Sequence, residues 1–249
     1  MIDKLQVTSY KLRRKKLWLA AALLLGCAGC ATAPVERGVF EPLSPHESAR
    51  ALAQIAAGTT GWQLVKYTMD CRFDLPETST DKAATEQFTA TCVWEPGGRL
   101  RLRARRFRLS VADVLFDGTH WYVTDEMNQR AYRTRNIARV RMARIPRVFF
   151  RQLQQLPHGW INYLEPYTVS ASPDAYRLET VTDVFTRRMI VPRGSPLPSE
   201  LIITTPDGSA LYADISAPDT QVTPHAAMFE PLIAGYEFYD LDTGERLSP

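Results

Sequence analysis

Residues 99–109 read RLRLRARRFRL, and six of these eleven residues are arginine. The first arginines alternate with three apolar residues, Leu100, Leu102 and Ala104. A period of two with one apolar and one charged face is typical of a half-buried antiparallel strand, so we expect the arginine face to be solvated. The alternation changes phase at residues 105–106, and a β-bulge there would keep the next apolar residues on the inner face: Phe107, Leu109 and Val111.

A cationic stretch of this kind also suggests a polyanion as ligand, which makes the destination of the chain important. Residues 11–16 hold five cations, and the nine residues 17–25 are uncharged and apolar. A positive segment followed by a short apolar segment and small residues is typical of a secretory signal peptide. The apolar run is shorter than the roughly 20 residues that span a bilayer. We therefore expect residues 1–26 to be a signal peptide that is removed on export.

The end of this segment, Leu24-Leu25-Gly26-Cys27, resembles the lipobox of bacterial lipoproteins. The resemblance implies cleavage before Cys27 and attachment of lipid to that cysteine, with Cys30 as the alternative site. Two or three acyl chains give stable anchoring. Ala28 stands where an Asp would signal retention in the inner membrane, which favours a periplasm-facing anchor in the outer membrane. Residues 27–43 are then the acylated cysteine and a tether, and residues 44–249 form a single folded domain.

Removal of the signal peptide changes the net charge of the chain. Residues 1–26 hold six of the 30 basic and one of the 27 acidic residues, which leaves 24 and 26 and a net charge of −2. Of the 24 remaining cations 22 are arginine, a bias of the whole chain rather than of one site. A slightly acidic envelope protein has no general electrostatic attraction for nucleic acid, so we expect no nucleic-acid partner.

Two further cysteines, Cys71 and Cys92, lie in alternating apolar segments joined by a polar loop. Because exported proteins fold under oxidising conditions, we expect a disulfide between them. Two unpaired thiols, or a bridge from Cys30 to one of the pair, are the alternatives. The cysteines and the four histidines lack the spacing of a metal site. We expect no metal, no cofactor and no enzymatic activity.

We expect the first folded element to be a helix. Ser44-Pro45-His46-Glu47 is a capping box with proline at the first helical position, and it predicts a helix over residues 45–57. A period of two begins after Trp62 and predicts strands at 61–73 and beyond. Asp117-Gly118 predicts a hairpin turn between two strands.

A second helix is expected over residues 146–156, where PRVFFRQLQQL interrupts the strand pattern. Further strand segments follow it to the C-terminus, about ten strands in all. The expected fold class is therefore α+β and dominated by β-structure. Because a single antiparallel sheet of this size must curl, we expect an incomplete, open β-barrel with the helices covering its concave face.

Residues 97–133, GGRLRLRARRFRLSVADVLFDGTHWYVTDEMNQRAYR, resemble the LolA/LolB lipoprotein-carrier superfamily. In that family a Gly-x-Leu strand leads into an arginine-rich kink with a Phe, then to a strand ending in Asp-Gly and to an aromatic strand. The matching positions are Gly98, Leu100, Leu102, Phe107, Asp117, Gly118, Trp121, Asp125 and Gln129. The resemblance implies an incomplete barrel with a helical lid over an apolar cavity, and the lipobox makes the chain LolB-like.

The resemblance also implies a function: binding of the acyl chains of a lipoprotein or lipid, for transport or insertion at the outer membrane. A periplasmic carrier protein is then an expected partner, and the chain is expected to be a monomer. By strand and helix parity, the cavity residues are expected to be Leu100, Leu102, Phe107, Leu109, Trp121, Val123, Phe149, Leu153 and Leu156.

Two surface features bear on this function. The segment PHGWINYLEPY, residues 157–167, is a candidate membrane-contact loop with Trp160 and Ile161 at its tip. If these two side chains are buried instead, a structural or interaction role in the envelope without any ligand is favoured. Guanidinium groups match phosphate geometry, so the arginine face offers candidate contacts to lipid phosphates, at Arg101, Arg103 and Arg105.

Overall fold

The computed structural model describes residues 38–78, 82–107, 109–142, 145, 147–162 and 164–247, all within one unit, Gly38–Pro249. The expected signal peptide, the lipobox with Cys27 and Cys30, and most of the expected tether lie outside the described residues. The end of the expected tether is part of the fold, because Glu41 and Pro42 pair with another strand. None of the helices in the described ranges has the length and apolar character needed to cross a membrane.

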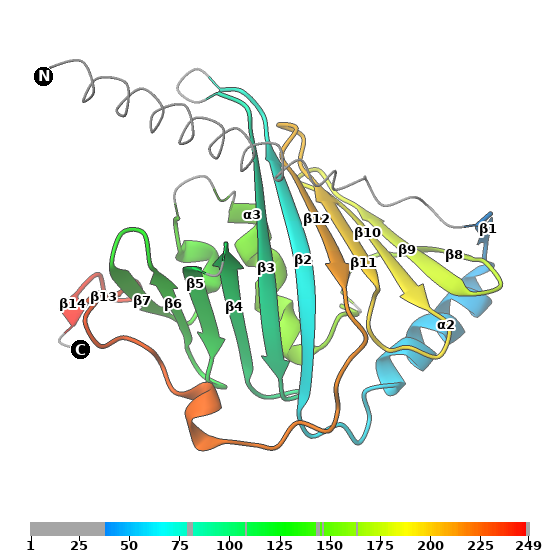
Figure 1. The fold of residues 1–249 in the computed structure, drawn as a ribbon. Helices are drawn as coiled ribbons and strands as arrows, with labels where there is room; N and C mark the ends of the chain where they lie inside the picture. The colour runs from blue at the N-terminus through cyan, green and yellow to red at the C-terminus, as the bar shows by residue number, and fades with distance from the viewer. Residues whose placement is uncertain are drawn as a thin grey trace, which may run out of the picture. The chain divides into compact units, whose positions relative to one another are not determined.

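Within the described residues, fourteen strands form one sheet (Figure 1). In spatial order its strands are β1 (Glu41–Pro42), β8 (Thr168–Ala171), β9 (Ala175–Val181), β10 (Thr186–Pro192), β11 (Glu200–Thr204), β12 (Ala210–Ile215), β2 (Val65–Leu75), β3 (Ala84–Trp94), β4 (Leu100–Arg106), β5 (Leu109–Phe116), β6 (Trp121–Asp125), β7 (Arg130–Thr134), β13 (Glu237–Asp240) and β14 (Arg246–Leu247). The order ends at β1 and at β14, so the sheet is open. The expected fold class is confirmed, with more strands than the sequence indicated.

Two meanders build this sheet. Strands β2 to β7 follow one another as antiparallel neighbours, and strands β8 to β12 do the same. The second meander joins the first where β12 pairs with β2, with Ile215 opposite Met69. The last part of the chain then crosses to the far edge, where β13 pairs with β7 in parallel. The final strands, β13 and β14, therefore lie beside the first meander.

The helices are α2 (Pro45–Ala57) and α3 (Arg147–Gln155), with the short 3-10 turns η1 (Ile137–Arg139), η2 (Leu156–His158) and η3 (Ala226–Phe229). The capping box is confirmed. The Glu47 N–H donates to Ser44 Oγ at 3.4 Å, and the Ser44 N–H donates to Glu47 Oε2 at 3.0 Å. These bonds satisfy donors that the start of a helix leaves free, so α2 begins where the sequence predicts.

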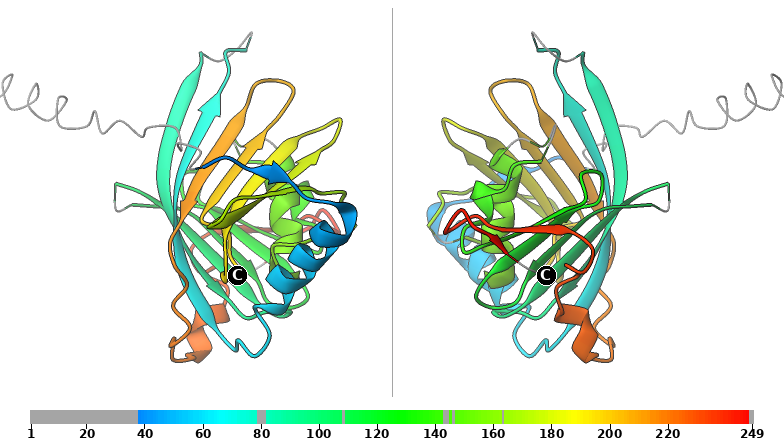
Figure 2. Two further views of the ribbon diagram at one scale, coloured as in Figure 1. Left: turned by 90° about the vertical axis from the view of Figure 1, so that its right-hand side faces the viewer. Right: turned by 90° about the vertical axis from the view of Figure 1, so that its left-hand side faces the viewer.

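Both helices lie on the inner face of the curled sheet (Figure 2). Ile55 of α2 and Phe149 and Phe150 of α3 belong to the same buried cluster as the inward residues of the strands. Within this cluster the Phe149 ring meets the Phe73 ring edge-on, with 4.6 Å between centroids. The expectation that helices cover the concave face is confirmed.

The stretch RLRLRARRFRL folds as a hairpin and not as one bulged strand. β4 pairs with β5, and Arg106 lies opposite Leu109. Phe107, in the turn between them, has a φ of +48°, which is the left-handed conformation that two-residue hairpin turns use. A register shift is present one position earlier than expected, between Ala104 and Arg105. The sequence analysis missed the turn because no Gly, Asn or Asp marks it.

The outer face of the sheet is covered in part, whereas the sequence analysis expected it to be solvated. The chain between β12 and β13, drawn in orange in Figure 1, pairs with β2 through an isolated bridge between Asp219 and Lys66. A second, smaller buried cluster forms on this side of the sheet, from Leu64, Leu115 and Phe229. We call residues 217–230 the outer strap.

The expected disulfide is wrong, because Cys71 and Cys92 are both free and buried. They lie on neighbouring strands and on the same face, but Cys71 is opposite Phe88 and Cys92 is opposite Tyr67. This offset of four residues separates them by about 13 Å along the strands, beyond the roughly 7 Å between Cα atoms that a disulfide can bridge. Burial raises the pKa of both thiols to about 12, so they stay protonated.

Candidate apolar ligand site

A continuous apolar layer lies between the sheet and α3. Six of the nine residues expected to line a cavity belong to its buried cluster: Leu100, Leu102, Trp121, Val123, Phe149 and Leu156. Leu153 of α3 is half-buried and packs against the same cluster. The alternation in the strands and the helical spacing therefore predicted correctly that these side chains from β4, β6, α3 and η2 share one buried cluster.

Phe107 and Leu109 do not line this layer. Their side chains are 80% and 72% exposed. The expectation for these two residues was wrong because the chain reverses at Phe107, so both lie at the tip of the β4–β5 hairpin instead of along an inward strand face. An exposed pair of large apolar side chains is the consequence.

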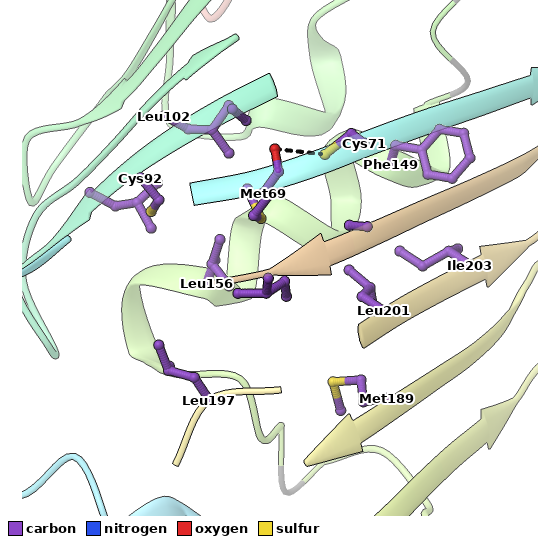
Figure 3. Close-up of a cluster of buried hydrophobic side chains, with 14 of the residues drawn as sticks. Met69, Cys71, Cys92, Leu102, Phe149, Leu156, Met189, Leu197, Leu201 and Ile203 are labelled. Atoms are coloured by element: carbon purple, nitrogen blue, oxygen red, sulfur yellow. Dashed lines mark hydrogen bonds between the residues drawn. The ribbon is translucent and has the colours of Figure 1, made fainter. Parts of the chain in front are cut away.

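The second meander supplies the other wall of the layer, which the sequence analysis did not assign to the site. Figure 3 shows these side chains together with those of β2 and η2: Met69, Leu156, Met189, Leu197, Leu201 and Ile203. Methionine is flexible and fills irregular gaps, so Met69 and Met189 allow this part of the interior to adapt its shape. The alternation of apolar residues in β10 and β11 was the signal that could have identified Met189, Leu201 and Ile203.

A pocket of about 300 Å³ lies beside this layer. Ile55 and Ala56 of α2 line one side, residues 158–162 another, and Pro196 a third. Gly58 permits this arrangement, because a Cβ at that position would lie 2.8 Å from the Pro196 Cβ. The described residues that line the pocket include no Asp, Glu, Lys or Arg. His158 is the titratable residue among those that line it, beside the uncharged polar Thr59, Gln155 and Asn162.

Two buried hydrogen-bond donors meet next to the pocket. Tyr67 is 2% exposed, and its hydroxyl contacts the Trp160 indole N–H and the Cys92 thiol, although neither contact has good hydrogen-bond geometry. The two rings lie 6.2 Å apart between centroids, and Trp160 lines the pocket. Burial, with a smaller contribution from Cys92, raises the pKa of Tyr67 well above its usual value, so the hydroxyl keeps its proton. Tyr67, Trp160 and Cys92 therefore form a small buried polar group within the apolar layer.

The segment before Trp160 supplies a hydrogen-bond acceptor to a second indole, that of Trp94. Trp94 Nε1 donates to the Pro157 carbonyl at 3.1 Å. Trp121 differs, because its buried Nε1 has no acceptor in the described ranges while its ring packs at 4.8 Å from that of Phe116. The indoles of the inner layer are thus not all satisfied in the same way.

Arg187 of β10 ties α3 to the sheet. Its side chain is buried, and it donates to Gln152 Oε1 of α3 at 2.7 Å and to the Tyr167 hydroxyl at 2.7 Å. It also forms an ion pair with Glu165. The sequence analysis missed this residue, although a charged side chain at an inward position of an alternating strand is an identifiable signal.

The arginine face is used inside the protein as well as toward solvent. Arg101 is 3% exposed and donates to both carboxylate oxygens of Asp113, at 2.8 Å and 3.0 Å, and to the Met228 and Glu230 carbonyls of the outer strap. Arg101 is therefore not available for lipid phosphate, and that expectation was wrong. Arg103 is half-exposed and also pairs with Asp113, and Arg105 is exposed.

The expected membrane-contact loop is not at the surface in the way the sequence suggested. Trp160 and Ile161 are half-buried and pack against the main cluster. Leu164, three residues on, is 91% exposed and lines the pocket. In the described ranges, no three His, Cys, Asp or Glu side chains gather as a metal site.

No protein-family model and no curated protein sequence matches the chain, whereas solved structures do. An uncharacterized conserved protein from Thermus thermophilus has a TM-score of 0.51 at 7% identity, over 78% of this chain and 99% of that one. A LolA superfamily protein from Nitrosomonas europaea has a TM-score of 0.45 at 10% identity, over 73% and 96%. A DUF1329 family protein from Desulfovibrio piger has 0.43 at 12%, over 76% and 98%. At these identities the likeness concerns the fold alone, and the resemblance to the LolA superfamily stays a prediction from the sequence.

Proposed function

We propose that this chain is a periplasm-facing, lipid-anchored protein of the outer membrane that binds acyl chains of a lipoprotein or lipid between its sheet and its helices. The observation that supports this most directly is the pocket of about 300 Å³ beside a continuous apolar layer. Ligand sites for small molecules are concave and mostly apolar, with few polar groups. Binding is non-covalent, and transfer follows the difference in affinity between the protein that delivers the ligand and this one.

The anchor is proposed from the sequence. Cys27 carries the lipid, with Cys30 as the alternative. Mass spectrometry of the chain extracted from membranes tests this directly, because the acyl mass should be lost in Cys27→Ala and kept in Cys30→Ala. The opposite pattern would move the anchor to Cys30, and an unmodified chain in both would refute it.

Contact with the membrane is proposed for the tip of the β4–β5 hairpin in place of Trp160 and Ile161. Phe107 and Leu109 are exposed there, next to Arg105 and Arg106. Apolar side chains flanked by cations suit an interface with anionic lipid. Co-flotation with vesicles containing anionic lipid should fall when Phe107 and Leu109 are both changed to Ser. The matched control is Val184→Ser, an exposed apolar residue between β9 and β10.

The test of ligand binding is native mass spectrometry with lipid extraction, on a chain in which Cys27 and Cys30 are both Ala so that no attached lipid confuses the result. We expect acyl-bearing molecules to co-purify. Ala56→Trp fills the pocket and should abolish them, while Ala53→Trp on the exposed side of α2 should not. A ligand-free chain that also ignores added acylated peptide would contradict the proposal.

That last result would favour the second candidate, an envelope protein with a filled core and a structural or interaction role. The observation in its favour is that Trp160 and Ile161 pack against the main cluster. Its partner would then be sought among envelope proteins by crosslinking.

A further inference from the structure

We propose that the exposed face of helix α3 and the connection before it bind the phosphate groups of an anionic phospholipid surface, through Arg141, Arg147 and Arg151. The inference rests on the proposed membrane contact of the β4–β5 hairpin tip and goes beyond it, because it names a second contact surface and the class of lipid that this surface binds. Three observations carry it: a segment without acidic residues, arginines without ion-pair partners, and the place of α3 at one rim of the sheet.

The first observation is a concentration of positive charge in the sequence. Residues 127–164 hold eight arginines and no Asp or Glu. The 223 residues after the expected cleavage site hold 26 acidic residues, so 38 consecutive residues would hold about four on average. The preference of the whole chain for arginine over lysine explains which cation is used here, but not why acidic residues are missing. Outside this segment the same 223 residues hold 16 basic and 26 acidic residues, a net charge of −10.

The second observation is that the fold neutralises only part of this charge. Three of the eight arginines form ion pairs with acidic residues near the C-terminus. The pairs are Arg130 with Glu237, Arg133 with Asp240 and Arg139 with Asp242. Arg141, Arg147 and Arg151 are exposed, and none of them has an ion-pair partner within the described part of the chain. These three cations therefore remain available to an anion from outside the protein.

The three available arginines belong to one structural unit. Arg147 and Arg151 are four residues apart on α3, so they project from the same side of the helix. Phe149 and Phe150 are its buried residues. Arg141 lies in the connection between η1 and α3, and η1 is held to α3 by the Ile137 N–H, which donates to Gln154 Oε1 at 3.1 Å. Guanidinium groups bind phosphate through two parallel hydrogen bonds, so this cationic face suits phosphate.

The third observation places the start of α3 near the β4–β5 hairpin tip. Both β2 and β4 pair antiparallel with β3, so they run in the same direction and end at the same rim of the sheet. Arg105 is level with Asp70 across β3, which puts the tip at Phe107 level with the Phe73 end of β2, about 10 Å away. The Phe73 ring meets the Phe149 ring at 4.6 Å between centroids. The cationic helix therefore begins at the rim that carries the exposed apolar tip.

This combination favours lipid over an acidic protein as the partner. Phe107 and Leu109 are exposed at the hairpin tip of this rim. A bilayer offers hydrocarbon to such side chains and phosphate to the neighbouring cations, within one interface. An acidic protein surface would satisfy the arginines alone.

The experiment is vesicle flotation with residues 38–249, which form one compact unit without the expected signal peptide and acylated cysteine. One vesicle is phosphatidylcholine alone, and the other contains about one third phosphatidylglycerol, which makes its surface anionic. We expect binding to the anionic vesicle, and a steep loss when NaCl is raised from about 0.05 M to about 0.5 M, because salt screens exposed charges. Arg147→Gln with Arg151→Gln should weaken binding about 30-fold, and Arg141→Gln about fivefold, the usual contributions of two cations and of one near an anionic surface.

The matched control is Arg50→Gln with Lys66→Gln. It removes the same charge from two exposed positions, on α2 and at the end of β2 that is opposite the rim. Both positions are separated from the rim by more than the Debye length of about 10 Å, so the control should weaken binding less than about twofold. Circular dichroism should confirm that all variants fold.

Equal binding to the two vesicles would overturn the inference, and so would a loss in the α3 double variant no larger than in the control. A parent chain that ignores both vesicles but is retained on poly-glutamate, through the same arginines, would show an acidic protein as the partner and refute lipid.

The hairpin variant separates this inference from the proposed contact on which it rests. If Phe107→Ser with Leu109→Ser abolishes flotation and the α3 double variant does not weaken it, the hairpin contact stands and the arginine surface is refuted. If the arginines matter and the hairpin does not, the arginine surface stands and the hairpin contact is refuted. Acyl binding is tested independently, by the co-purification experiment with Ala56→Trp.

Discussion

Arg101 on β4 and Asp113 on β5 form a buried ion pair beneath the outer strap, with 2.8 Å between Nη2 and Oδ2 and side chains only 3% and 6% exposed. The same guanidinium donates to carbonyls at positions 228 and 230, more than 120 residues along the chain. One residue of the arginine-rich stretch therefore joins the first meander to the C-terminal part of the fold.

We expect Arg101→Ala to lower the free energy of unfolding by about 3 kcal/mol, because it leaves Asp113 buried with only Arg103 as partner. Arg105→Ala, four residues away on the exposed end of the strand, should change it by less than about 0.5 kcal/mol. Urea unfolding of both variants measures the difference. Equal losses of unfolding free energy in the two variants would show that the ion pair of Arg101 with Asp113 does not stabilise the fold.

Arg187→Met should loosen α3, since it removes the bonds to Gln152 and Tyr167 while keeping the length of the side chain. The expected result is faster amide hydrogen exchange over residues 147–155, by about tenfold for a loss of about 1.4 kcal/mol in local stability. Arg151→Ala, an exposed residue of α3, is the control and should leave the exchange rates unchanged. Unaltered exchange in Arg187→Met would contradict the tie between β10 and α3.

Tyr67→Phe should destabilise the ligand-free protein less than Tyr176→Phe does, because the Tyr67 hydroxyl contacts Trp160 and Cys92 without good hydrogen-bond geometry. Tyr176 is the comparison, since its hydroxyl accepts from Arg193 at 2.6 Å and its loss should destabilise by about 1 kcal/mol. Thermal unfolding of both variants measures the difference, and an equal loss in the two would show that the Tyr67 contacts are as strong as that of Tyr176.

The two buried thiols make stability depend on alkaline pH. Burial raises the pKa of Cys71 and of Cys92 from 9.0 to about 12, so between pH 9 and pH 12 the unfolded chain loses protons that the folded chain keeps. Stability contributed by the protonated thiols is present below pH 9 and falls above it, by at most about 1.4 kcal/mol per pH unit for each group. Unfolding measured from pH 8 to pH 11 should show this slope.

The variant with both Cys71 and Cys92 changed to Ala is the control. Its unfolding free energy should depend less on pH above pH 9, whatever its stability at pH 8. The same thiols provide a check on the absent disulfide. A reductant should leave the melting temperature unchanged, and both cysteines should react with iodoacetamide only after unfolding. A melting temperature that drops on reduction would refute the unpaired state.

Much of the fold follows from local patterns in the sequence. The capping box at Ser44 and Glu47 predicts the start of α2, because each bond joins residues three apart. The alternation of Leu100 and Leu102 with arginines predicts which side chains face inward. Trp121 and Val123 join the same layer for the same reason. Helix capping and strand parity depend on neighbours in the chain, so they can be predicted without knowledge of the tertiary structure.

Other features depend on register and on chain crossings, which the sequence does not specify. A four-residue offset between β2 and β3 decides that Cys71 and Cys92 stay apart. An unmarked turn at Phe107 moves that side chain from the inner layer to the hairpin tip. Tyr67 and Trp160 become neighbours only because the loop after α3 folds back over β2. The sequence alone determined the elements, their inward faces and the open β-rich fold, whereas tertiary structure decided the polar contacts, because hydrogen-bond partners are set by positions that are distant in the chain.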